Sequence, residues 1–232
     1  MDNPHKGHRK RLRDQFLKNG LEYMQPHQVL ELLLFFSIPQ ADTNVYAHNL
    51  LDRFGSIAGV FNAGFDELQT VKGIGENSAT LIKLIPQLYA RYATSAFEGV
   101  KLKSSQDMCR FFIAQFYGVT VEETRLVCVD DMMNIVLNSK LSSGDPGSVA
   151  CSPRKIVETV IKSGCNQCIL SHNHPKSNCE PSKEDYSVTM NLQRLLRELG
   201  ITLIDHVVVG RDGARTILNG DISILTKRER QV

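Results

Sequence analysis

The strongest constraint on the fold is a run of metal-binding residue types between a predicted strand and a predicted helix. His172 and His174 follow Gln167–Leu170, an apolar segment short enough to be a buried strand. Side chains two positions apart on a strand share a face, so both imidazoles should project together while Asn173 points away. Asp185 then begins a segment whose apolar residues recur at helical spacing. A carboxylate in the first turn of that helix can face back toward the end of the strand.

These three side chains make a donor set typical of zinc. Two imidazoles and one carboxylate, with a fourth position left for water, are the ligands of a catalytic zinc site. Ser182 adds a hydroxyl nearby. Each half of the pattern also has an ordinary explanation: Ser182 and Asp185 suit a helix N-cap, and the two histidines suit hydrogen-bonded core residues. Both halves together, with Pro175 ending the strand and Pro181 preceding the helix, favour the metal site.

The same residues resemble a known family. His-x-His-Pro followed by Ser-x-x-Asp is similar to the JAMM, or MPN-plus, metalloprotease motif, and the longer runs Ile169–Pro175, Glu180–Asp185 and Leu203–Gly210 resemble the RadC family. The resemblance extends over nearly the whole chain. It implies a JAMM-type α/β domain that uses zinc to hydrolyse an amide or isopeptide bond in a protein or peptide substrate. It also implies a glutamate, upstream of the histidine strand, that acts as general base.

Two glutamates adjoin the predicted strand Thr124–Asp130 and are candidates for that base, which takes a proton from the attacking water. Glu122 fits the spacing of the resembled family best, and Glu123 is the alternative. A solvated strand edge would explain either residue. In the same mechanism, Ser182 would hydrogen-bond the developing oxyanion.

The chain departs from the RadC pattern in three places. Lys176–Ser177 stands where the family usually has Ser-Gly, Lys155 replaces a glutamate, and Thr124 replaces an aromatic residue. The predicted metal ligands are untouched, so metal binding is still expected. The choice of substrate stays open.

Periodicity predicts an α+β protein with a helical domain over residues 1–99 and an α/β domain with a central mixed sheet over residues 100–232. The resemblance implies that the second domain is of the JAMM type. The first domain should hold helices at Arg9–Leu17, at Gln28–Phe36, from the cap Asp42–Asn44 to Phe54, after Ser56, and from Glu76 onward through Pro86. The second should hold helices from Ser104 or Ser105 to Phe116, Ser152–Gly164 and Asp185–Leu199, with strands at Thr124–Asp130, Ile135–Leu141, Gln167–Leu170, Thr202–Val209 and Arg215–Leu218.

A glycine turn between two amphipathic segments of the first domain resembles a helix-hairpin-helix. Lys72, Gly73, Ile74 and Gly75 form this turn, and its backbone N–H groups suit contact with a DNA phosphate. Such contacts position a duplex without reading its sequence. The basic run His5–Arg13 supports the same hypothesis. The alternatives are a tight helical turn or a protein-packing module for the hairpin, and a solvated helix end for the basic run.

Composition adds three limits. A formal net charge of +2 does not by itself indicate a nucleic-acid-binding protein. No apolar run reaches membrane-spanning length and the first residues lack a signal-peptide core, so a cytoplasmic protein without membrane contact is expected. Its cysteines should then be free thiols. Cys165 and Cys168 are interpreted as small apolar residues rather than a redox motif or structural zinc site, and Cys179 is expected to stay outside the metal site.

Three functions remain open. The first is a zinc-dependent amide or isopeptide hydrolase; the second is a DNA-binding accessory protein with a structural metal; the third is a metal-dependent nuclease. A single metal favours acyl chemistry, because phosphoryl transfer typically uses two metals about 4 Å apart. Asp205 and His206 form one more polar pair, for which a structural role is expected. The alternatives are that the pair contacts the metal ligands or binds the metal itself.

Overall fold

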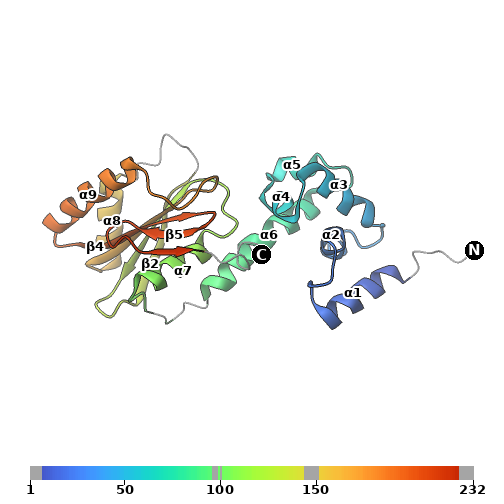
Figure 1. Ribbon diagram of the computed structural model, residues 1–232, viewed down its shortest axis with the longest axis horizontal. Coiled ribbons are helices and arrows are strands. Elements are labelled where there is room, and N and C mark those ends of the chain that lie inside the picture. The colour runs from blue at the N-terminus through green and yellow to red at the C-terminus, as the bar shows by residue number, and fades with distance from the viewer. Residues whose placement is uncertain (1–6, 96–98, 100, 144–151, 225–232) are drawn as a thin grey trace, which may run out of the picture. The chain divides into compact units, whose positions relative to one another are not determined.

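The computed structural model describes residues 7–95, 99, 101–143 and 152–224 (Figure 1). Contacts divide the chain into two compact units, Met1–Leu88 and Tyr89–Val232. The first unit is helical and the second mixes helices with a six-stranded sheet, which confirms the predicted fold class. The helix α6 (Glu76–Ser95) crosses this boundary. Its last turns belong with the second unit, because Tyr89 packs on the ring of Tyr117 and Thr94 accepts a hydrogen bond from Gln115.

The helices of the first unit begin and end near their predicted positions. They are α1 (His8–Asn19), α2 (Pro26–Leu34), α3 (Asn44–Phe54), α4 (Ile57–Asn62) and α5 (Phe65–Gln69), followed by the start of α6. Ser56 caps α4 by accepting a hydrogen bond from the Gly59 N–H, as its position predicted. Their apolar faces meet in a core that includes Leu30, Leu50 and Ile82. No helix in the described part of the chain is long and apolar enough to cross a bilayer.

The sheet of the second unit has the strand order β2-β1-β3-β4-β5-β6. The strands are β1 (Glu123–Val129), β2 (Ile135–Ser143), β3 (Gln167–Asn173), β4 (Thr202–Gly210), β5 (Gly213–Thr216) and β6 (Ile222–Ile224). β3 and β4 are parallel, whereas the other neighbours are antiparallel, so the sheet is mixed as predicted. The parallel pair is joined through α9 (Lys183–Glu198), which covers the sheet and packs on β4.

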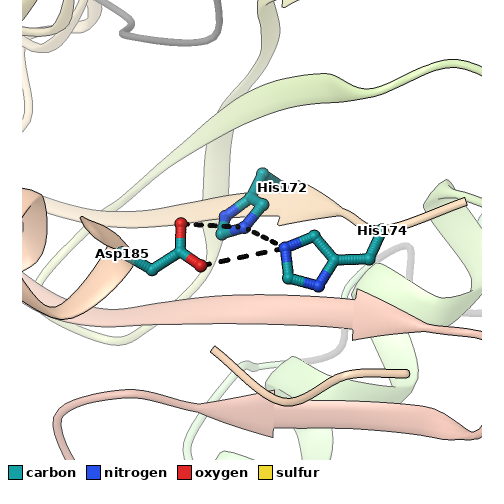
Figure 2. Close-up of side chains that lie close together, drawn as sticks. All are labelled: His172, His174 and Asp185. Atoms are coloured by element: carbon teal, nitrogen blue, oxygen red, sulfur yellow. Dashed lines mark hydrogen bonds and ion pairs between the residues drawn. The ribbon is translucent and has the colours of Figure 1, made fainter. Parts of the chain in front are cut away.

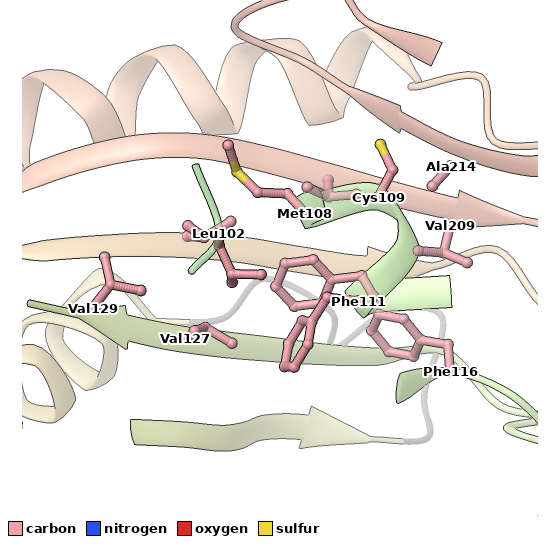
Figure 3. Packing of buried hydrophobic residues seen from close by; sticks show 12 residues of the cluster. Leu102, Met108, Cys109, Phe111, Phe116, Val127, Val129, Val209 and Ala214 are labelled. Atoms are coloured by element: carbon pink, nitrogen blue, oxygen red, sulfur yellow. The ribbon is translucent and has the colours of Figure 1, made fainter. Parts of the chain in front are cut away.

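Helices cover both faces of this sheet. On one face, α7 (Ser105–Gln115) buries aromatic side chains against alternate residues of the strands (Figure 3). On the other face, α8 (Pro153–Ser163) and α9 bury Ile156, Val160, Leu192 and Leu196. Cys168 and Leu170 of β3 belong to this second core. Because strand side chains alternate, His172 projects on the same face as Leu170, toward the helices α8 and α9.

The end of the sheet differs from the sequence prediction. The strand expected at Arg215–Leu218 is β5 at Gly213–Thr216, because Gly210 and Gly213 pair across a tight turn and set its start. The short strand β6 was not predicted. The loop expected at residues 144–147 lies outside the described residues.

Candidate metal centre

The two histidines and Asp185 converge on one point at the end of β3 (Figure 2). His172 Nε2 lies 3.1 Å from His174 Nε2 and 3.2 Å from Asp185 Oδ1, and His174 Nε2 lies 3.8 Å from Asp185 Oδ2. Among the described residues, these three make up the one group of at least three His, Cys, Asp or Glu side chains close enough to share an ion. The sequence predicted this convergence, and it comes from two neighbouring elements, β3 and α9.

Asp185 is aimed by the start of its own helix. Its Oδ2 accepts hydrogen bonds from the N–H and the hydroxyl of Ser182, each at 2.7 Å, and Ser182 Oγ accepts from the Asp185 N–H at 3.1 Å. This reciprocal capping box fixes the carboxylate at the helix N-terminus. The two interpretations of the Ser-x-x-Asp pattern are compatible, since the capped carboxylate also faces the histidines. Ser182 commits its single hydroxyl proton to Asp185, so its predicted oxyanion role requires that hydroxyl to rotate.

Asp185 is held in its ionised form. Burial pushes the pKa of its carboxyl upward, but the hydrogen bond and charge of His172, together with the Ser182 hydrogen bonds, more than offset this and hold the pKa below its usual range. The group therefore presents a carboxylate at neutral pH, which is the form that binds a cation.

His174 is oriented by the loop that follows it. The carbonyl of Asn178 lies 3.1 Å from His174 Nδ1, and the His174 N–H donates to the Val209 carbonyl. A carbonyl can only accept, so Nδ1 carries the proton and Nε2 is left with its lone pair toward His172 and Asp185. Cys179, next in this loop, has a buried thiol whose pKa burial raises to about 11, and it lies outside the three-residue group.

The two candidate bases are in different surroundings. Glu123 is buried and paired with Arg125 and Lys140, each at 3.2 Å. Thr124 lies directly opposite His172 on β3, so the alternation of side chains puts Glu123 on the face away from His172. Glu122 directly precedes β1. Glu122 is half-buried.

Comparison with known proteins gives a family. A family model described as "RadC-like JAB domain" matches residues 102–219. A UPF0758 protein of Fusobacterium nucleatum is 31% identical over 214 residues, covering 89% of this chain and 92% of the relative. A UPF0758 protein of Ruegeria pomeroyi is 30% identical over 205 residues, covering 88% of this chain and 92% of the relative. The chain belongs to the RadC family. The matched RadC region contains the whole candidate metal centre and both glutamates.

The residues that depart from the RadC pattern have different surroundings. Lys155, at the start of α8, donates a hydrogen bond to the Leu141 carbonyl of β2. Thr124 lies opposite His172. Its hydroxyl is buried and has no hydrogen-bond partner in the described part of the chain. Ser177 accepts a backbone hydrogen bond from Arg211, which helps to fasten the loop after His174 to the turn between β4 and β5.

Gly210 gives a prediction for this RadC loop. A Cβ at this position would lie 2.1 Å from backbone atoms of Asn178 and Cys179, so Gly210→Ala must push the loop away and withdraw the carbonyl that orients His174. We expect weaker metal binding, measured by chelator competition, and a lower melting temperature. Gly75→Ala is the control, because a Cβ there meets open space at an ordinary backbone angle. Equal effects from both substitutions would contradict this account.

His206 lies next to the centre rather than in it. Its side chain is buried on β4, with Nε2 2.8 Å from His172 Nδ1. Burial, followed by the neighbouring charge of His172, drives the pKa of His206 well below its usual value. Asp205, its neighbour, instead accepts backbone hydrogen bonds from His206 and Leu218. The sequence analysis expected a structural role for this pair, with a contact to the ligands as an alternative. His206 makes that contact, with His172.

The predicted DNA-contacting residues lie in the first unit, in the turn between α5 and α6. Gly73 has φ +91° and is covered by the ring of Tyr46, and Ile74 is buried in the core. Gly75 faces open space, beside a cavity of about 320 Å³ that Ser37, Asn77 and Ser78 also line. From the basic run, Arg9 is used internally, since it donates to the carbonyls of Ile38 and Ala41 and stacks over Phe35. DNA contact through Lys72 and the turn stays a prediction.

Proposed function

We propose that this RadC-family protein is a zinc-dependent hydrolase of amide or isopeptide bonds in a protein or peptide. The observation that carries the proposal is the spacing of the three donor atoms. Four-coordinate zinc holds nitrogen and oxygen ligands at about 2.0–2.2 Å, which puts neighbouring ligand atoms of a tetrahedron about 3.3 Å apart. His172 Nε2 lies 3.1 Å from His174 Nε2 and 3.2 Å from Asp185 Oδ1, and the second oxygen of Asp185, Oδ2, lies 3.8 Å from His174 Nε2. One donor atom from each residue lies within 4.8 Å of the other two. The set therefore fits zinc and leaves one position for water or substrate.

Glu122 is the residue proposed to move the proton. A zinc ion bound here would supply a water with a pKa near neutrality and would polarise the carbonyl of the substrate. Glu122, the residue directly before β1, takes the proton of the attacking water and delivers it to the leaving amine. Glu123 is unsuited to this task, because its carboxylate is already paired with two cations on the opposite face.

The position of Glu122 is further supported by Asn173. This buried amide donates to the Val121 carbonyl at 3.0 Å and accepts from the Glu123 N–H at 2.7 Å. It therefore holds the backbone on both sides of Glu122, and it does so from the strand position between the two histidines. One side chain thus couples the placement of the proposed base to that of the proposed ligands.

Asn173 gives the second prediction. Asn173→Ala should leave zinc content unchanged, because both histidines keep their strand positions, and should lower the hydrolytic rate constant by about 100-fold, since a misplacement of about 1 Å at a reacting group has that effect. The control is Asn191→Ala, which changes an exposed asparagine of α9. Loss of zinc in Asn173→Ala, or full activity, would argue against this role.

The proposal as a whole is tested by removing the metal. Zinc-loaded and chelator-treated protein are assayed side by side on a peptide, an isopeptide-linked conjugate and a DNA duplex. We expect zinc-dependent cleavage of an amide substrate and an intact duplex, with activity restored when zinc is returned. Zinc-dependent cutting of DNA would instead support a nuclease, and DNA binding without cleavage of any substrate would support an accessory protein; either result would overturn the hydrolase.

A DNA-associated role for the helical unit is the second candidate. The observation in its favour is the open backbone at Gly75 beside the cavity that precedes α6, because free N–H groups at a helix N-terminus suit a phosphate. Glu76, the acidic residue in the first turn of that helix, opposes an anion. The binding of the DNA duplex in the substrate panel, measured at two salt concentrations, separates phosphate contact from no contact.

A further inference from the structure

We propose that His206 and Thr189 are positioning residues that fix the tautomer of His172, so that its Nε2 presents a lone pair to the metal. The inference rests on the proposed metal site and adds to it two residues that are neither ligands nor proton carriers. They come from different elements, His206 from β4 and Thr189 from α9. Three hydrogen bonds in series connect the Asp185 carbonyl to His172 through Thr189 and His206.

The chain starts at Thr189. Its hydroxyl oxygen lies 2.6 Å from the main-chain carbonyl oxygen of Asp185, one helical turn earlier. A carbonyl cannot donate, so the single hydroxyl proton of Thr189 belongs to this bond. The same hydroxyl oxygen lies 2.6 Å from His206 Nδ1. With its own proton committed, Thr189 can only accept there, and His206 Nδ1 must carry the proton of that second bond.

The next proton is placed by the contacts of His206. Its side chain is 3% exposed, and its two ring nitrogens meet Thr189 Oγ and His172 Nδ1. Because Nδ1 carries the ring proton that bonds Thr189, Nε2 is left to accept. His172 Nδ1, 2.8 Å away, therefore donates to it.

The outcome is a defined ligand. With the proton on Nδ1 bonded to His206, a cation that displaces the proton between His172 Nε2 and Asp185 Oδ1 would meet a lone pair on Nε2, the atom that also faces His174 Nε2. This series of hydrogen bonds begins at the main-chain carbonyl of Asp185 and ends at His172, which lies beside the carboxylate of the same Asp185. Partners of this kind orient a histidine ligand and raise its basicity. Thr189 and His206 thus prepare one ligand and tie it to the helix turn that supplies another.

Substitutions at Thr189 test the chain with little change in shape. Thr189→Val removes the hydroxyl and leaves the proton of His206 Nδ1 without an acceptor, whereas Thr189→Ser keeps the hydroxyl. By competition with a chromophoric chelator, Thr189→Val should bind zinc about tenfold more weakly, Thr189→Ser like wild type, and His206→Leu about 10- to 100-fold more weakly. Circular dichroism identifies a variant that has not folded. Equal zinc affinity of folded Thr189→Val and wild type would overturn the proposal.

The tautomer itself gives a readout that does not depend on activity. In protein with ¹⁵N-labelled histidine, long-range proton–nitrogen spectra should show His206 protonated on Nδ1 and unprotonated on Nε2. A proton on Nε2 of His206 would overturn the chain of donors. If the wild type binds no zinc, the proposed function fails, while the tautomer of His206 in the zinc-free protein still decides the present inference. The two failures are therefore distinguishable.

Discussion

Glu122→Gln is expected to lower the rate of amide hydrolysis by about 10²- to 10⁴-fold, the usual contribution of a general base. Glutamine has nearly the same shape but cannot take a proton from water. Glu122 is not one of the three residues grouped as possible metal ligands, so the zinc content of the variant should be unchanged. The rate is measured on whichever substrate the zinc-loaded wild type cleaves, with metal analysis of the same samples.

Two further substitutions make this result specific. Glu184→Gln neutralises an exposed carboxylate in the first turn of α9 and should keep full activity. Glu123→Gln removes a buried charge that holds Arg125 and Lys140, so it should lower stability more than it lowers the rate per folded molecule. Full turnover by Glu122→Gln together with an inactive, folded Glu123→Gln would assign the base to Glu123 instead.

His174→Ala is expected to abolish stoichiometric zinc binding, and hydrolysis with it. Only an imidazole and a carboxylate would remain, fewer than the three protein ligands usual for catalytic zinc. The fold should survive, because the side chain makes one hydrogen bond to a protein atom outside the centre, to the Asn178 carbonyl, and such a bond contributes about 1 kcal/mol. Metal analysis after dialysis, with a melting curve on the same sample, measures both effects.

A histidine elsewhere provides the control for this loss. His48 lies exposed on α3, stacked on His27, and His48→Ala should retain zinc at the wild-type level. If folded His174→Ala also retains it, the metal is bound elsewhere and the centre described above is not the zinc site.

The convergence of the metal centre could be predicted from the sequence because each of its parts is local. Strand alternation puts His172 and His174 on one side, and helix capping aims Asp185, so neither step needs a distant contact. The helix boundaries were also predictable, since glycine and capping residues set them. The sequence favoured metal binding over capping alone for Asp185, and the structure shows that this one carboxylate contacts both the cap residue Ser182 and the histidines.

The supporting residues were not predictable, because their partners are far away in sequence. His206 meets His172 across 34 positions, and Asn173 reaches Val121 across 52. Nothing in the local pattern around either residue specifies such a partner. The apolar spacing of α9 was misleading in detail: Leu192 and Leu196 are buried, but Val188 and Met190 are half exposed. Thr189 occupies the buried face instead, as expected for a residue kept for its hydroxyl rather than its hydrophobicity.

The shared use of Asp185 has a thermodynamic consequence. Its Oδ2 completes the first turn of α9 and lies 3.8 Å from His174 Nε2, while its Oδ1 lies 3.2 Å from His172 Nε2. An ion held there would therefore be linked to the unravelling of that turn. Occupancy would protect the helix end against local opening, and opening would release the ion. Ser182 is not one of the three proposed ligands. It would still affect how tightly the ion is held, because its hydrogen bonds to Asp185 determine how often the first turn of α9 opens.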